Sequence, residues 1–161
     1  MVRREYRHLV VALAETASRA DAGHASEERA HVALWDAFAD ALGSDGDRPP
    51  EPETAACAEA WSPEDQLEAL SVLCAVEGAQ PAISRTKLDG LLAHYGFEEG
   101  RATEYFSVHA TLDAEHAARS RVALLRRAQG DDVDRLVGAA EAALRGNWKM
   151  LDGVRRAIER R

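Results

Sequence analysis

Between positions 31 and 42 the large apolar side chains recur at every third or fourth residue. Leu34, Trp35, Phe38 and Leu42 follow this spacing, which places them on one face of an α-helix. Nowhere does the sequence show the sustained alternation of apolar and polar residues that predicts a half-buried strand. Valine, isoleucine and aromatic residues are scarce, whereas alanine and arginine are abundant, and this balance also favours helix over sheet. The sequence therefore predicts an all-α fold.

Start and stop signals divide the chain into helical segments. Ser26, followed by two acids, is typical of an N-cap, and Gly43 is typical of a helix end. The run Ser62-Pro63-Glu64-Asp65 predicts another helix start, and Pro81 predicts a break. We expect a bundle of six or seven helices in one domain, residues 1–161. The expected helices cover residues 2–20, 26–43, 53–59, 62–77, 81–96, 99–127 and a last segment after Gly130.

Composition excludes several classes of protein. The net charge is −8 and the basic clusters lie at helix ends or the terminus, so we expect no nucleic-acid partner. No apolar run approaches the ~20 residues that span a bilayer, and no signal-type segment is recognisable, so we expect no membrane partner. Cys57 and Cys74 form neither a disulfide framework nor a Cys-x-x-Cys metal site. These features predict a cytoplasmic protein.

Three residues with metal-binding side chains lie on one stripe of the expected long helix. His109, Asp113 and His116 have i, i+4 and i+7 spacing, so their side chains project within about 60° of one another. Phe106 and Leu112 flank them, which indicates that the stripe faces the core. Two imidazoles and a carboxylate suit iron or manganese, and burial without a metal would require many polar partners. The pattern predicts a metal site.

Earlier segments offer further ligands. Glu28-x-x-His31 places a carboxylate and an imidazole one turn apart, an arrangement seen in carboxylate-bridged di-metal bundles. Glu77 ends an apolar run, where a lone carboxylate needs a partner. Each residue also has a simpler interpretation. Glu28 can stabilise a helix N-terminus, His31 can pack near Trp35, and Glu77 can lie in water at a helix end.

Four stretches together resemble the heme-oxygenase-like superfamily, and more narrowly its non-heme diiron oxidases and oxygenases related to pyrroloquinoline-quinone synthase and thiaminase II. The resemblance covers most of the chain. The run from Ala102 to Ala117 is similar to that branch's His-x3-Asp-x2-His helix, and this motif together with Glu77 upstream is fairly specific. The stretches that carry the resemblance are residues 31–43, 68–96, 102–117 and 147–154.

The resemblance implies a heme-oxygenase-like bundle that binds two iron ions, with manganese as an alternative. It implies an oxidase or oxygenase that activates O2 and acts on a small molecule, in a biosynthetic pathway. Carried over by position, the metal ligands are Glu28, His31, Glu77, His109, Asp113 and His116. The acid beside His31 stays open, because Glu27, Asp21 and the imidazole of His24 compete with Glu28. The chain is expected to be shortened at its N-terminus relative to this family, and exposed apolar surface then favours a homodimer.

Two rival functions remain open from the sequence. The thiaminase branch of the superfamily is metal-free and uses a cysteine nucleophile, for which Cys74 lies near the corresponding helix. The chain is alternatively a non-catalytic or regulatory bundle of the same superfamily. Tyr95 and Tyr105 are interpreted as core residues with satisfied hydroxyls and are not assigned to the catalytic set.

Overall fold

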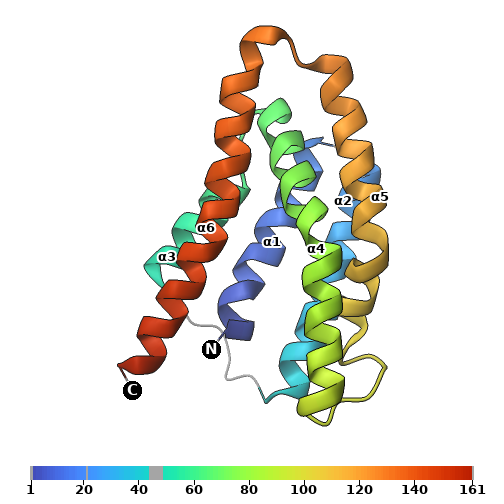
Figure 1. Cartoon of the computed structure of the whole chain (residues 1–161), viewed down its shortest axis with the longest axis vertical. Coiled ribbons are helices and arrows are strands. Elements are labelled where there is room, and N and C mark those ends of the chain that lie inside the picture. Colours follow the sequence, from blue (N-terminus) through green and yellow to red (C-terminus); the bar gives the residue numbers. More distant parts are fainter. Residues whose placement is uncertain (1, 21, 44–48, 161) are drawn as a thin grey trace.

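The computed structural model of the chain describes residues 2–20, 22–43 and 49–160. Within these ranges the fold consists of helices, without a strand, as the sequence predicted (Figure 1). The elements in chain order are α1 (Val2–Ala20), α2 (Ala22–Ala41), α3 (Pro52–Trp61), α4 (Gln66–His94), α5 (Glu104–Arg127), a 3-10 turn (Gly130–Asp132) and α6 (Val133–Glu159).

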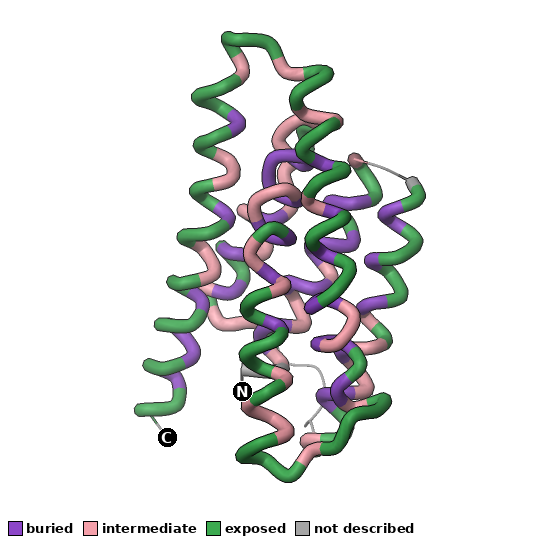
Figure 2. Tube along the Cα trace, turned by 45° about the vertical axis from the view of Figure 1, so that its right-hand side comes forward, coloured by how far each residue is buried: buried purple, intermediate pink, exposed green. Residues whose placement is uncertain are grey.

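The helices pack in neighbouring pairs. α4 lies along α5, α1 along α2, and α3 along α6. α5 and α6 are joined by a turn at the end of the molecule opposite to both termini, and below it they pack on other helices, α5 on α4 and α6 on α3 (Figure 1). Buried residues follow the inner faces of the helices, while the outer faces of α5 and α6 are largely exposed (Figure 2). The bundle therefore has one interior, and α1, α2, α4 and α5 all contribute buried side chains to it.

Trp35 of α2 is the centre of an aromatic cluster in this interior. Its ring centroid lies 4.9 Å from that of Tyr6 on α1 and 4.9 Å from that of Tyr105 on α5. Phe38 and Phe106 complete the cluster at 5.3 and 6.0 Å. Because all five side chains are at most 7% exposed, the cluster ties three helices together immediately below the polar residues described in the next subsection.

Four helix boundaries predicted from the sequence are wrong. The long helix expected from residue 99 begins at Glu104, as α5. α2 begins at Ala22, so Ser26 lies inside the helix and does not cap it. α4 begins at Gln66, where Asp65 accepts hydrogen bonds from the amides of Leu67 and Glu68, and Ser62 instead ends α3. Pro81 does not end a helix: it lies inside α4, which continues to His94. The packing of α4 along α5 outweighs the one backbone hydrogen bond that the proline removes.

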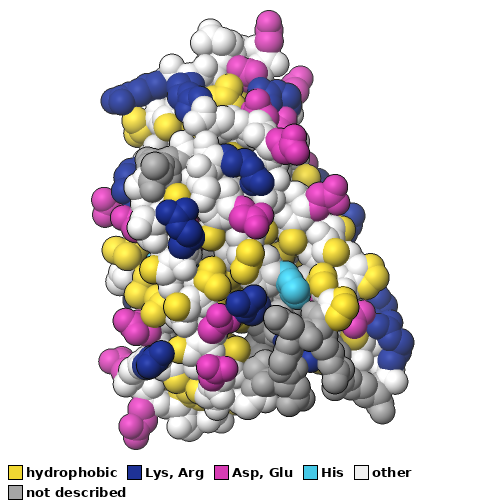
Figure 3. Space-filling model, turned by 180° about the vertical axis from the view of Figure 1, so that it is seen from behind, with side chains coloured by type: hydrophobic (Ala, Val, Ile, Leu, Met, Phe, Trp, Pro, Cys, Tyr) yellow, Lys and Arg dark blue, Asp and Glu magenta, His cyan; other side chains and the backbone are white. Residues whose placement is uncertain are grey.

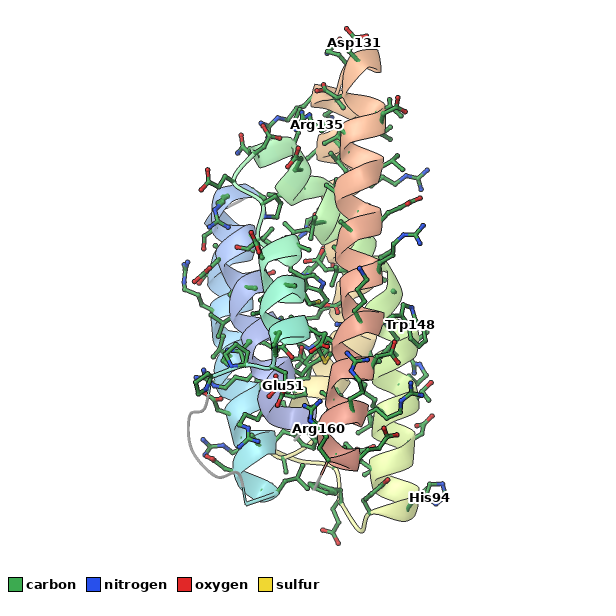
Figure 4. All side chains as sticks on the ribbon, turned by 90° about the vertical axis from the view of Figure 1, so that its left-hand side faces the viewer. Glu51, His94, Asp131, Arg135, Trp148 and Arg160 are labelled. Carbon is green, nitrogen blue, oxygen red and sulfur yellow. The ribbon has the colours of Figure 1, made fainter. Side chains whose placement is uncertain are left out.

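The outer surface carries interspersed charges of both signs. Figure 3 shows basic and acidic side chains scattered over the face opposite to that of Figure 1, with apolar residues between them. An ion pair between Glu53 and Arg156 links α3 to α6 at the surface. A second pair joins Glu51, directly before α3, to Arg160, directly after α6 (Figure 4). None of the helices in the described ranges has the length and hydropathy that a bilayer-spanning segment requires.

Substitutions at two glycines of α6 can show how closely α3 and α6 approach each other. A Cβ added at Gly146 would lie 3.2 Å from Cys57 Sγ and 3.3 Å from its Cα, whereas one added at Gly138 would meet nothing within 4 Å. Alanine gains about 1 kcal/mol over glycine in a helix interior at either position. We predict that Gly138→Ala raises the free energy of unfolding and that Gly146→Ala is less stable than Gly138→Ala by about 1 kcal/mol or more.

Urea denaturation followed by circular dichroism measures both free energies of unfolding. Equal gains for the two variants would contradict the close approach of α3 to α6.

Candidate metal centre

Two groups of ligand-type side chains lie together in the interior of the bundle. In the first group, one ligand atom from each of His24, Glu28, Glu77 and His116 lies within 4.8 Å of every other. The second group contains Glu28, His31 and His109 under the same condition. Glu28 belongs to both groups, and every member is at most 5% exposed. The arrangement could therefore hold two cations that share one carboxylate.

α2 and α5 carry the same ligand spacing and face each other across the site. His24, Glu28 and His31 repeat the i, i+4, i+7 pattern of His109, Asp113 and His116. The ring of His24 lies 4.5 Å from that of His116, and the ring of His31 lies 4.4 Å from that of His109. The first histidine of each helix therefore faces the last histidine of the other, which requires the two helices to run in opposite directions.

Glu28 is the most connected acid of the site. Its Oε1 lies 2.9 Å from His31 Nδ1, 3.6 Å from His24 Nε2 and 3.8 Å from His116 Nδ1. Burial alone would raise the pKa of Glu28, but the contacts with His24 and His31 outweigh burial and hold the pKa below its ordinary value. Glu28 is thus an anion in the core, placed between imidazoles from both helices.

Glu77 reaches the site from α4. Its Oε1 lies 2.8 Å from His24 Nε2, at the end of the site where His24 and His116 meet. Burial raises the pKa of Glu77 to about 7, partly opposed by His24. Burial would lower the pKa of His24, yet its contacts with Glu28 and Glu77 raise it to about 10. In the metal-free chain a proton on His24 therefore partly neutralises two carboxylates.

Two histidines are oriented by groups behind them. His109 Nδ1 lies 2.6 Å from the carbonyl oxygen of Tyr105, and because a carbonyl only accepts, Nδ1 carries the proton and Nε2 is left with its lone pair. Burial lowers the pKa of His109 to about 4, which also favours the neutral ring. His116 Nε2 lies 2.9 Å from Glu27, which Arg119 in turn contacts at 3.1 Å. Such outer partners fix the tautomer and direction of metal-binding histidines.

Asp113 lies beside His116 of the first group and lacks a hydrogen-bond donor. Neither of its carboxylate oxygens makes a hydrogen bond within the described part of the chain, and the nearest ion-pair contact is His116 Nδ1 at 3.8 Å. Burial, reinforced by the negative charges of Glu28 and Glu77, raises the pKa of Asp113 to about 8. A buried carboxyl without a partner is costly, and a cation at the site would supply what it lacks. The donor set therefore fits a bound metal.

The structure brings together all six residues that the sequence nominated as ligands. Glu28, His31, Glu77, His109 and His116 belong to the two groups above, and Asp113 lies beside them. Of the candidates left open beside His31, Glu27 is half-exposed behind His116, and Asp21 lies outside the described residues. His24 joins the site in addition to Glu28. The signal that identifies it is the spacing His-x3-acid-x2-His, which α2 shares with α5.

A cavity of about 480 Å³ is lined by residues that lie one helical turn from His31 and from His109. Trp35 lies one turn beyond His31 on α2, Phe106 lies one turn before His109 on α5, and both line the cavity. Its remaining lining residues are Phe38, Leu42, Thr86, Lys87, Gly90, Leu91, Tyr95 and Ile158. The volume suits a small organic molecule, and the wall is mainly apolar and aromatic.

A helical bundle with facing His and carboxylate ligands on separate helices defines a class of metal-dependent proteins. The chain belongs to a family of iron-containing redox enzymes, whose match covers residues 3–152.

Among curated relatives, it is 34% identical over 136 residues to a 4-aminobenzoate synthase of Nitrosomonas europaea, covering 79% of this chain and 55% of the relative. It is 30% identical over 130 residues to a 4-aminobenzoate synthase of Chlamydia muridarum, covering 76% and 55%. The chain spans about half the length of these relatives.

We predict that Asp113→Asn stabilises the metal-free protein while weakening metal binding. The folded-state pKa of Asp113 lies above its unfolded value of about 4, so the folded chain binds more protons and its stability falls as the pH rises from about 4 to about 8. The amide avoids this loss. The gain should be largest at pH 8, about a third as large or less at pH 5, and absent below about pH 4.

Chelator-treated protein unfolded by urea at the two pH values measures the effect of Asp113→Asn. Asp89→Asn, on the exposed side of α4, is the matched control and should change stability by less than about 0.5 kcal/mol. A destabilised Asp113→Asn variant at pH 8 would indicate that the carboxylate has a partner in the metal-free state.

Proposed function

We propose that the chain is a cytoplasmic di-iron oxidase or oxygenase that activates O2 and acts on a small molecule in a biosynthetic pathway. The observation that carries the proposal is Glu28, which belongs to two ligand groups at once. Two ions could be held there, one by His24, Glu28, Glu77 and His116 and one by Glu28, His31 and His109, with Asp113 beside His116 as a further ligand. Iron bound at these residues would supply the redox chemistry of O2 activation. The same donors also accept manganese.

The chain's own residues prepare the site in three ways. The Tyr105 carbonyl and Glu27 direct the lone pairs of His109 and His116 inward. The proton on His24 leaves when a cation binds, since a ligating imidazole must be neutral, so metal uptake releases acid. The aromatic residues Trp35 and Phe106 separate the ligands from solvent on the cavity side. Water exclusion strengthens the electrostatic interactions inside the site.

We infer that the substrate is a small aromatic molecule that carries a carboxylate. The cavity beside His31 and His109 has an aromatic wall, and Lys87 contributes an ammonium group to its lining. Lys87 Nζ lies 4.7 Å from the Tyr6 ring centroid, and the residue keeps access to solvent. An anionic substrate group in the cavity would pair with this ammonium group. The relatives named 4-aminobenzoate synthase are consistent with this class of molecule.

The thiaminase-like alternative is disfavoured by the environment of Cys74. Burial, together with the negative charge of Glu77, raises the pKa of its thiol, whereas a nucleophilic cysteine requires a lowered pKa. Cys74→Ala should therefore leave metal content and activity unchanged.

Iron content tests the di-iron proposal. After anaerobic loading with Fe(II), elemental analysis should find about two irons per wild-type chain. His24→Ala removes a ligand from one group only and should retain about one iron, whereas Glu28→Ala affects both groups and should retain less than one. Glu15→Ala, on the exposed side of α1, is the control. Less than one iron per wild-type chain would instead support a non-catalytic bundle.

Quenching of tryptophan fluorescence tests the cavity, because Trp35 lines it. Titration with 4-aminobenzoate should quench the emission, and Lys87→Met should weaken binding about 10-fold, while Lys87→Arg retains most of it because it keeps the charge. Equal affinities of wild type and Lys87→Met would show that the ammonium does not recognise the carboxylate.

We also propose that the chain is a homodimer. Eleven large apolar residues of the described ranges are at least 36% exposed, and six of them lie on α6. Exposed apolar residues that gather on one element are typical of an interaction surface.

A further inference from the structure

The two groups of ligand-type side chains in the candidate metal centre offer unequal numbers of donors. The first group has four members, and Asp113 lies beside it, with Oδ1 3.8 Å from His116 Nδ1. The second group consists of Glu28, His31 and His109. In the part of the chain that the structure describes, no fourth His, Cys, Asp or Glu meets the same distance condition with these three. Five side chains therefore surround the first group's position, and three surround the second.

Glu77 is the main origin of this difference. α2 and α5 contribute histidines alike, since each carries the spacing His-x3-acid-x2-His and each places one histidine in either group. Glu77 comes from a third helix, α4, and its Oε1 lies 2.8 Å from His24 Nε2, so it joins the first group only. At the opposite end of the site the ring of Tyr105 packs 4.0 Å from that of His109. One end of the site thus gains a carboxylate where the other gains an aromatic ring.

The two positions also differ in charge and in the room that they leave around a cation. Glu28, Glu77 and Asp113 place three carboxylates at the first group, whereas Glu28 alone serves the second. Each carboxylate attracts a divalent cation at short range, so the first group should bind its ion more tightly. Two imidazoles and one carboxylate, as in the second group, are the donor set that leaves coordination positions open in non-heme iron oxygenases.

The second group is also the one closer to the cavity. Trp35 lies four residues after His31 on α2, and Phe106 lies three residues before His109 on α5. Both aromatic residues line the cavity of about 480 Å³. The histidines of the first group lie two further turns away along the same helices. A small molecule in the cavity is therefore nearer to the second group than to the first.

We propose that the two ions have different roles. The first group encloses a tightly bound ion, and the second group, Glu28, His31 and His109, holds an exchangeable ion at which small exogenous ligands coordinate. This inference rests on the proposed di-iron function and divides that function between named residues. Glu77 is the residue whose charge makes the two positions unequal.

Titration with cobalt(II) measures the order of binding. Cobalt(II) accepts the same donors as iron(II), and its visible absorption depends on its coordination number. Chelator-treated protein, followed by absorption and calorimetry, should show two binding events, of which the first is tighter. Glu77→Gln removes a charge from the first group only, so it should raise the first dissociation constant about 10-fold or more and leave the second nearly unchanged. Glu59→Gln, exposed on α3, is the matched control.

Sodium azide probes the open coordination position, because azide is a small anion that binds metal ions with a free position. The spectrum of the wild type should not respond to azide with one equivalent of cobalt and should respond with two. His109→Ala should keep the first binding event and lose the azide response, whereas His24→Ala should weaken the first event and keep the response. Sodium chloride at equal concentration is the control for ionic strength.

A second pair of variants covers the case in which one of these substitutions prevents folding, which circular dichroism would show. His31→Ala should behave as His109→Ala does, and His116→Ala as His24→Ala does, because each pair belongs to one group.

The outcomes separate this division from the di-iron function itself. A wild type that takes up fewer than two cobalt ions overturns both. Two ions of equal affinity, an azide response at one equivalent, or a first event that His109→Ala weakens and His24→Ala leaves intact would overturn the division alone. The di-iron function would then stand with two equivalent ions or with the roles reversed.

Discussion

The carboxylate of Glu28 is the interaction on which the rest of the interior depends. Its Oε1 lies within 3.8 Å of histidine nitrogens from both α2 and α5, at a depth where 1% of the residue is exposed. Such burial is tolerated only when opposite charge surrounds the anion, so the two helices must keep their imidazoles directed at it. With Glu77 and Asp113 added, three acids share a core whose polar groups satisfy one another only in part.

The apolar part of the core supports this polar cluster. Tyr105 stacks 4.0 Å from the ring of His109 and also provides the carbonyl that fixes its tautomer, while Trp35 packs against Tyr105 from α2. Side chains held by large rings have few alternative rotamers. The aromatic cluster thus packs three helices together and also positions the histidines of the site. A substitution in the cluster is therefore expected to disturb the geometry of the site as well.

Spacing along single helices predicted the helical class and two groups of ligand-type residues, Glu28 with His31 and His109 with Asp113 and His116. Glu77 has no partner on its own helix, and it joined the predicted ligands through the family resemblance. The ends of the helices were harder to predict from the sequence. Ser26 has the local chemistry of a cap, yet the packing of α1 against α2 extends the helix to Ala22, and the extension places His24 on the ligand face. The break predicted at Pro81 fails for the same reason, since tertiary packing outweighs a local preference. The pairing of His24 with His116 depends on the relative placement of two helices, which no local pattern contains.

The residues that could bind metal come from positions that are far apart along the chain, and this has a consequence for the order of folding. Residues 24–31, 77 and 109–116 meet only after α2, α4 and α5 have docked, across sequence separations that make such contacts late events. A single helix can offer half of a site at best, so a cation is captured tightly only by the nearly finished bundle. Bound metal then stabilises the folded state by mass action. Metal availability in the cell would thus set how much of this chain persists in its folded form.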